Sequence, residues 1–549
     1  MSRRWQRYWF DDGGRTALAI IRVAIATSVL LTLARLDDPV STGSRALSRP
    51  VGIWMLFGDS APPAVLVDLL WVLAWAATAA MLVGLVTRAA TAVSFVTAVA
   101  LASLSFSSSL TWSHQYNVVF LAQLAFLGAR GGDVLSLDWL IRRWRGLPEL
   151  NVPRGYQWSL RLVQLAVALM FVGAVFHKFL HGHFTLRWAL SDNLRHHLLM
   201  RFDLAGLERP PLVDWLIAEP WRYRTAAVLN MISQAAPLAA VLFVRRPLVR
   251  AIAGAFFVIE TIALGLVVEL WNLHWLPLAA VFVDWDRLVA FLARRPVVHP
   301  EVPAAWRPPR AQRVFIVAFV VYDVITACVP TLDQRLNTYP FSGFPMFATL
   351  RARAPYDQHQ PYGVAGVWFE VISDRPPDLP MQRWFDHTNR SITAVRDPEV
   401  LYRRMKSVLE HAQQRYPGFG VRGMRLWLAI YETAAYPAPA RFERKPIALL
   451  GELLPDGTFR TALGTLKGTP GPSSENVTLT MQLRGIAEPA TAKLVYYRDE
   501  LPSPVDIAVE RDGPTWDLAY QPVEGHPLHL VAILDGTPWV VATHAPWRW

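Results

Sequence analysis

The sequence predicts a polytopic α-helical membrane bundle of about nine spans, followed by an extramembrane α/β region and a C-terminal β-sandwich. Apolar runs of about 20 residues, long enough for a helix to cross a bilayer, recur up to residue 330. The chain is 53% hydrophobic and holds 23 tryptophans, a balance typical of polytopic membrane proteins. We therefore expect a transmembrane domain at 1–330, an extracytoplasmic mixed α/β domain at 331–467 and an immunoglobulin-like β-sandwich at 468–549.

Each predicted span is an apolar segment bounded by charged or turn residues. The nine segments are 16–35, 64–86, 89–108, 115–129, 160–180, 224–243, 249–270, 273–289 and 312–330. If the N-terminus is inside, arginines collect in the inner loops and are few in the short outer loops. Cytoplasmic loops are enriched in basic residues, so the pattern predicts a cytoplasmic N-terminus and extracytoplasmic C-terminal domains. The arginine- and alanine-rich composition is bacterial in character, so we expect a multi-pass protein of the inner cell membrane.

The net charge of +11 does not indicate a nucleic-acid partner, because the arginines that set topology cluster in short loops. Cys328 is the sole cysteine, which excludes an intrachain disulfide and a cysteine-based zinc site. His177, His181 and His183 have a spacing that suggests a metal site. A polar belt at the end of a span explains them better, so no metal ion is expected.

The region after residue 330 predicts strands and one helix. GVWFEVIS (366–373) and GMRLWLAIYETA (423–434) alternate like strands, and residues 397–416 form a helical pattern with Asp397 as its N-cap. Residues 468–476, GTPGPSSEN, predict a linker. Short apolar runs at roughly ten-residue spacing follow, which is typical of a small β-sandwich: VTLTMQL, AKLVYYR, VDIAVE, TWDLAY, LHLVAIL and WVVATH.

Lys178 is the most informative residue of the predicted bundle. It lies near the outer end of an almost unbroken apolar stretch, 160–183. A lysine at this depth either anchors the helix end at the lipid headgroups or is kept neutral to act as a base. Other spans bring polar side chains to the same leaflet: His114, Asn230, Ser233, Gln234, Glu260, Glu269, Asn272 and His274. Intramembrane ionisable residues usually face the bundle interior, so we expect an outward-opening apolar cavity for a lipid-soluble substrate.

The order of these segments resembles the HTTM (horizontally transferred transmembrane) domain, the membrane domain of vitamin K-dependent γ-glutamyl carboxylase and its bacterial relatives. ALAIIRVAIA, with Arg22, resembles the first span, and LVGLVTRAA resembles the turn between the second and third. SHQYNVVFLAQLAFLGA resembles the segment in which a histidine opens the fourth span. RLVQLAVALMFVGAVFHKF resembles the span with a glutamine at one end and a lysine at the other. The resemblance covers about residues 10–330.

The resemblance implies carboxylase/epoxidase-like chemistry on a lipid-soluble quinol at the extracytoplasmic side. In the carboxylase, a lysine deprotonates reduced vitamin K, and oxygen converts the quinol to a strong base and finally an epoxide. That base removes the γ-proton of a peptide glutamate before CO2 adds. Carried over by position, Lys178 is the expected catalytic base and His114 the catalytic histidine near the quinone. The expected substrate-binding residues are Tyr116, Asn117, His177, Asn230, Gln234, Glu260 and His274.

The implied cofactor is reduced vitamin K or menaquinol, and the implied partners are membrane lipid or quinone and an extracytoplasmic protein or peptide. The chain differs from the family at Glu260, where the family often has a histidine. A non-catalytic function also stays open, in which the bundle anchors the membrane protein and presents the β-sandwich to a partner. A transporter is a third possibility, but inverted-repeat halves with broken helices are not evident in the sequence.

Overall fold

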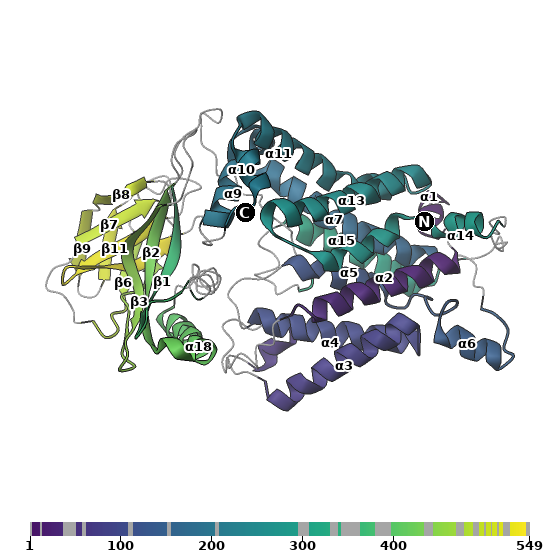
Figure 1. Cartoon of the computed structure of the whole chain (residues 1–549), viewed down its shortest axis with the longest axis horizontal. Helices are drawn as coiled ribbons and strands as arrows, with labels where there is room; N and C mark the ends of the chain where they lie inside the picture. Colours follow the sequence, from purple (N-terminus) through teal and green to yellow (C-terminus); the bar gives the residue numbers. More distant parts are fainter. Residues whose placement is uncertain are drawn as a thin grey trace.

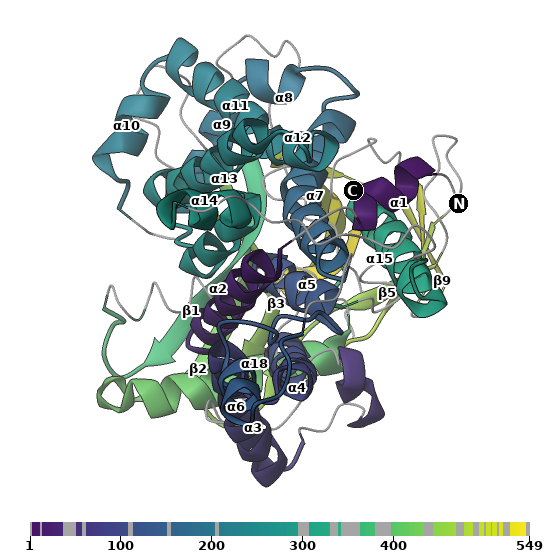
Figure 2. The ribbon, with the colours of Figure 1, turned by 90° about the vertical axis from the view of Figure 1, so that its right-hand side faces the viewer.

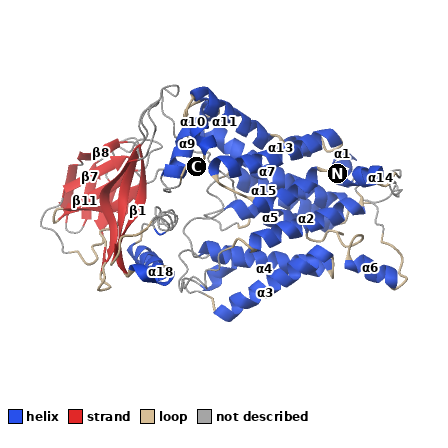
Figure 3. Ribbon diagram, viewed as in Figure 1, coloured by secondary structure: helices blue, strands red, loops and turns tan. Residues whose placement is uncertain are grey.

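The structure, a computed structural model, describes most of the chain. The described residues are 3–10, 14–36, 51–57, 62–107, 114–150, 155–203, 208–294, 307–329, 339–341, 363–378, 381, 397–432, 443–467, 477–486, 493–498, 501–506, 508–512, 515–519 and 528–544. The predicted linker at 468–476 lies outside them. Helices and strands are segregated, with a helical bundle at one end of the molecule and a strand-rich region at the other (Figure 3).

Seven helices in the described part of the chain are long and apolar enough to cross a membrane. They are α2 (Arg15–Leu33), α3 (Ala64–Val83), α4 (Thr87–Ser107), α7 (Gln157–His181), α11 (Pro220–Ala235) continued by α12 (Pro237–Leu242), α13 (Pro247–Val268) and α15 (Arg310–Cys328). Each coincides with one of the predicted spans. They run roughly along one direction in a single bundle (Figure 1), the architecture of an integral membrane protein.

The other two predicted spans, 115–129 and 273–289, are shorter helices. The α-helix α5 (Asn117–Phe126) and the 3₁₀ helix η3 (Leu273–Phe282) have ten residues each. At the usual rise per residue, α5 is about 15 Å long and η3 about 20 Å, both less than a regular spanning helix. Pro277 lies inside η3 and removes one backbone donor there, which disfavours a longer regular helix.

Hydrogen bonds hold the starts of α5 and η3 together and tie the segment after η3 to the start of α2. Trp275 Nε1 donates to the carbonyl of Gln115 at 2.6 Å, and His274 Nε2 lies 2.9 Å from the same oxygen. The starts of α5 and η3 are therefore adjacent. Beyond the other end of η3, Asp286 accepts a hydrogen bond from the backbone N–H of Gly14 at 2.8 Å. Because Gly14 directly precedes α2, η3 connects the two ends of the bundle.

Arg22 on α2 holds the loop that follows α5. Its buried guanidinium donates to the carbonyls of Gly131 (2.8 Å) and Leu135 (2.7 Å), and at 3.3 Å to that of Leu82 at the end of α3. Gly84, with φ of 72°, leaves room for it, since a Cβ there would lie 2.4 Å from Arg22 Nη1. The arginine therefore joins three segments that are far apart in the sequence.

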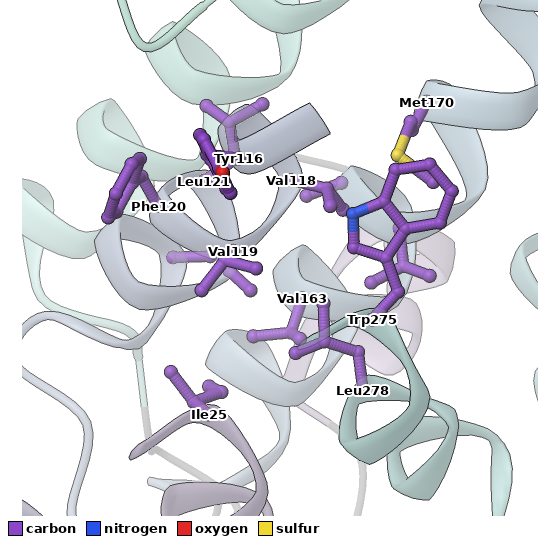
Figure 4. Packing of buried hydrophobic residues seen from close by; sticks show 14 of the residues in the cluster. Ile25, Tyr116, Val118, Val119, Phe120, Leu121, Val163, Met170, Trp275 and Leu278 are labelled. Carbon is purple, nitrogen blue, oxygen red and sulfur yellow. The ribbon is translucent and has the colours of Figure 1, made fainter. Parts of the chain in front are cut away.

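The helix α7 lies in the middle of the bundle. Seen along the bundle, it has α12 and α13 on one side, α5 and α2 on the other, and α15 beside it (Figure 2). Its core side chains interlock with those of α2, α5 and η3. Figure 4 shows this packing around Ile25, Val119, Val163 and Leu278. Polar residues of α7 are thus placed between two groups of helices.

Shorter helices connect the long ones and lie largely at the two ends of the bundle. They are α1 (Arg3–Phe10), η1 (Gly52–Phe57), η2 (His114–Tyr116), α6 (Leu137–Trp144), α8 (Arg187–Leu190), α9 (Asn193–Asp203), α10 (Pro211–Ile217) and α14 (Trp285–Leu292). The N-terminal helix α1, α6 and α14 lie at the end opposite the strand-rich region (Figure 1).

The strand-rich region contains two sheets. The larger has the order β1-β2-β3-β12-β11-β7-β8, with β4 beside β3, and the smaller has the order β5-β6-β10-β9. The strands are β1 (Gly363–Ser373), β2 (Val421–Glu432), β3 (Glu443–Leu453), β4 (Phe459–Arg460), β5 (Gly464–Lys467), β6 (Val477–Met481), β7 (Lys493–Arg498), β8 (Leu501–Asp506), β9 (Ala508–Asp512), β10 (Thr515–Ala519), β11 (Leu528–Leu534) and β12 (Thr537–His544). Trp539 of β12 pairs with Leu449 of β3, so the larger sheet takes strands from both sides of the predicted boundary at 467/468.

The helix α18 (Pro398–Arg415) confirms the helix expected at 397–416. The Asp397 side chain accepts from the backbone N–H groups of Glu399 (2.8 Å) and Val400 (3.0 Å), as an N-cap does. Leu401, Met405 and Val408 on its inner face join the core under β2 and β3. The one-turn helix η4 (Pro417–Phe419) then leads into β2.

Candidate functional site

Lys178, near the end of α7, is buried in a cluster of polar side chains. Its exposed fraction is 1%. The Nζ atom donates to Asn230 Oδ1 at 2.8 Å and to Gln234 Oε1 at 2.6 Å. These two residues are one helical turn apart on α11, so both amides face α7. Of the two alternatives that the sequence leaves open, the end-anchor reaching for lipid headgroups is excluded, because the amine points into the protein.

Glu260 on α13 completes the cluster from the other side of the two amides. Its Oε1 accepts hydrogen bonds from Asn230 Nδ2 at 2.6 Å and from Gln234 Nε2 at 2.8 Å. Its Oε2 accepts one from the hydroxyl of Ser233. Each amide thus bridges the two ionisable groups, with its oxygen toward the amine and its nitrogen toward the carboxylate. We name Lys178, Asn230, Ser233, Gln234 and Glu260 the lysine cluster.

Trp188 forms one wall of the lysine cluster. It lies on α8, which follows α7 after a short turn, and is buried. The Lys178 Nζ atom lies over the indole ring, 4.5 Å from its centroid. An indole face attracts a cation and also excludes water. The amine therefore has two amide oxygens and one aromatic face around it.

The lysine cluster is balanced in charge. One basic and one acidic side chain share it, and three further side chains supply hydrogen bonds. A buried ion pair is compatible with a stable fold only when hydrogen bonds of this kind satisfy both groups. Removing one partner typically lowers the free energy of unfolding by ~3–5 kcal/mol. Chemically, the arrangement holds one amine that can give or take a proton inside an apolar bundle.

His114 lies in a different place from Lys178. It lines a small pocket between α5, α7 and α15, together with Asn117, Met170 and Asp323. The pocket includes neither Lys178 nor any residue that hydrogen-bonds to it. His177 and Lys178 are consecutive on α7 and so point about 100° apart, which explains the separation. His177 Nε2 lies 2.9 Å from the carbonyl of Ala327 on α15.

Tyr116 and His274 form a third group, at the start of α5 and η3. Their ring centroids are 5.2 Å apart, and Tyr116 stacks on Phe106 at 6.2 Å. His274 is buried and is held by the carbonyl of Gln115. The expected site residues thus fall into three groups within the described residues, instead of lining one shared cavity.

The chain has no match in comparisons with protein-family models, curated proteins and solved structures. Within the ranges that the structure describes, no three His, Cys, Asp or Glu side chains are grouped so that they could hold a metal ion.

Asp323 and Trp188 are not among the residues predicted from the sequence, and neither is the neighbouring cluster of Asp192, Tyr223 and Arg224. Asp323 is the only acidic residue of the predicted span 312–330, so the rule that flagged Glu260 also applies to it. Trp188 carries no comparable signal. Near it, the hydroxyl of Tyr223 donates to Asp192 at 2.5 Å, and Arg224 pairs with the same carboxylate at 3.1 Å. That pairing depends on how α11 packs against α8 and α9, which the sequence does not reveal.

Proposed function

We propose that this chain is an integral membrane enzyme in which Lys178 exchanges a proton with a lipid-soluble quinol. The supporting observation is the lysine cluster: an amine buried inside the bundle, held by two amides and balanced by Glu260. An ionisable residue inside a membrane bundle is expensive to keep and commonly functional. Fixed amides and a water-excluding indole are features that proton-transfer sites use.

The chemistry we propose is the epoxidase-like reaction that the family resemblance implies. Lys178 acts in its neutral form: it takes the proton of a quinol hydroxyl and becomes the ammonium that Glu260 balances, and the resulting quinol anion reacts with O2. One oxygen atom enters the quinone epoxide and the other leaves in water. The quinol supplies the two protons of that water, including the one taken by Lys178, and all four electrons that O2 accepts. Reduced vitamin K or menaquinol is the proposed substrate, and a peptide glutamate is the group that a carboxylase-like second step would use. His114 and Asn117 line a separate small pocket that does not include Lys178, so the proposed proton transfer does not use them.

We further propose nine crossings of the membrane, with α5 and η3 as the two short ones. Support comes from the direction of the neighbouring helices, because α4 and α7 run the same way along the bundle and a return segment must lie between them (Figure 1). The arginine-bearing helices α1 and α6 lie at one end, which favours a cytoplasmic location for that end. The strand-rich region would then be extracytoplasmic.

The test is quinol turnover by the full chain in lipid nanodiscs. We expect reduced menaquinone plus O2 to give the epoxide with wild-type protein and at least a hundredfold less with Lys178→Ala. Lys406, exposed on α18, supplies the matched control, and Lys406→Ala should retain wild-type turnover. Equal turnover in Lys178→Ala, or none in the wild type, would reject the proposal.

A second candidate is a membrane anchor that presents the strand-rich region to a partner. The observation that favours it is the saturation of Lys178, whose amine is already covered by two amides and an indole. A purely structural cluster can be replaced as a unit by apolar side chains without loss of stability. The variant that replaces all five side chains, Lys178→Met/Asn230→Leu/Ser233→Ala/Gln234→Leu/Glu260→Met, should then match the wild type in stability and in binding of the partner. An enzyme would lose turnover in that variant.

A further inference from the structure

Asp323 is a carboxyl group on the inner face of an otherwise apolar helix. The buried positions of α15 are Ile316, Phe319, Asp323, Thr326 and Ala327, the spacing of one helical stripe. Asp323 is 2% exposed, although much of α15 faces away from the protein. The carboxyl is therefore turned toward α7 and α5 and away from the outer surface of the bundle.

The side chain of Asp323 has no basic partner among the described residues. Its Oδ2 atom is buried and accepts no hydrogen bond there. The neighbouring hydroxyl of Thr326 is not available, because it donates to the backbone carbonyls of Tyr322 (2.9 Å) and Asp323 (3.1 Å). Within the same ranges no arginine, lysine or histidine lies within ion-pair distance of this carboxyl.

Asp323 lines the pocket that His114 and Asn117 also line. The remaining walls are apolar and include Leu121 and Met170. The free space is about that of one water molecule, so a quinone ring does not fit. The pocket has room for a ligand of about the size of a water molecule, and its carboxyl group favours a ligand that is positively charged or donates hydrogen bonds.

We propose that this pocket is a binding site for one water-sized monovalent cation, with Asp323 as its counter-charge. An isolated carboxylate in a bundle interior is strongly unfavourable, and a bound cation removes that cost. One carboxylate balances one positive charge, and the described residues offer no second acidic group there for a divalent ion. Carboxylate and amide oxygens are suitable ligands for a hard cation. Sodium and ammonium carry this charge and are small, whereas transfer of a proton to Asp323 would neutralise the carboxyl and leave no bound cation.

The proposal is independent of the quinol chemistry, because the pocket contains no member of the lysine cluster. The other titratable groups near Asp323 are His114 at the start of α5 and His177 on α7, which contacts the Ala327 carbonyl. Their own titration is common to the wild type and to an Asp323 variant. A comparison of the two therefore isolates the carboxyl.

The test is thermal unfolding of the full chain in detergent at constant ionic strength. Choline chloride is replaced stepwise by sodium chloride or by ammonium chloride at fixed pH, and a third series that lowers the pH in choline alone tests for simple protonation of Asp323. We expect the sodium or the ammonium series to raise the Tm of the wild type, since a ligand that binds the folded state stabilises it. The effective series identifies the cation.

The diagnostic variant is Asp323→Asn, which keeps the shape and removes the charge. It should have a higher Tm than the wild type in choline at neutral pH, and it should no longer respond to the effective series. If Asp323 instead has a purely structural hydrogen-bonding role, Asp323→Asn should have a lower Tm than the wild type. Asp68→Asn is the matched control, because Asp68 is an exposed aspartate of α3. That variant should respond like the wild type.

Two results would overturn the proposal: no response of the wild type to sodium or ammonium, even if lower pH raises its Tm, or an equal response to the cation in Asp323→Asn. If the variant does not fold, equilibrium binding to the wild type replaces it. In that case binding of radiolabelled sodium, or of ammonium measured by calorimetry, with one site per chain supports the site. Binding of neither cation rejects it.

Discussion

Gln234 joins Lys178 and Glu260 with a single side chain, accepting a hydrogen bond from the lysine Nζ at 2.6 Å and donating one to the glutamate Oε1 at 2.8 Å. The three residues come from three helices, α7, α11 and α13. The amide therefore fixes the rotation of each helix relative to the others. This coupling makes the lysine cluster sensitive to any change in its charge balance.

Glu260→Gln should destabilise the protein strongly. The change leaves the Lys178 amine buried without a counter-charge, and breaking a buried pair in this way costs ~3–5 kcal/mol. Adding Lys178→Met to the same chain should recover most of that loss, because no uncompensated charge remains. Unfolding of the two variants in detergent measures both values. A double variant no more stable than Glu260→Gln would contradict this account of the cluster.

Trp188→Leu should weaken the hold on the lysine amine while keeping an apolar wall. The cation–π contact at 4.5 Å is lost, and such a contact contributes about 2 kcal/mol when it is desolvated. We expect a smaller loss of stability than in Glu260→Gln. Phe184, exposed after α7, supplies the control, since Phe184→Leu changes an aromatic residue outside the cluster. Equal effects of the two variants would show that the indole does not hold the amine.

Arg22→Lys should destabilise the bundle although it keeps the charge. The guanidinium donates to three carbonyls from two different nitrogen atoms. The single ammonium nitrogen of a lysine cannot reach all three. Each buried carbonyl left without a donor costs about 1–3 kcal/mol. The exposed Arg88 on α4 is the matched control, and Arg88→Lys should be nearly neutral. Thermal unfolding in detergent compares the two substitutions.

Much of the fold is readable from local patterns, whereas the site depends on packing. The apolar length of seven helices and the cap at Asp397 are properties of single segments, so the sequence predicts them. The partners of Lys178 depend on the rotation of α7, because a turn of 100° about its axis would exchange its surroundings with those of His177. The strand β3 is not among the predicted strands for a related reason, since its early residues ERKP are polar and become a strand by pairing with β2.

The proposed topology predicts which residues a membrane-impermeant maleimide can reach in intact cells. In a Cys328→Ala background, single cysteines would replace Trp144 on α6, Phe291 on α14 and Asp535 in the turn between β11 and β12, all of which are exposed. Asp535→Cys should react in cells whose outer barrier is opened and whose inner membrane is intact. Trp144→Cys and Phe291→Cys should react only after lysis, because nine crossings place α6 and α14 on the cytoplasmic side. A path that omits the short crossing of α5 moves α6 to the other side, so labelling of Trp144→Cys in intact cells would exclude nine spans.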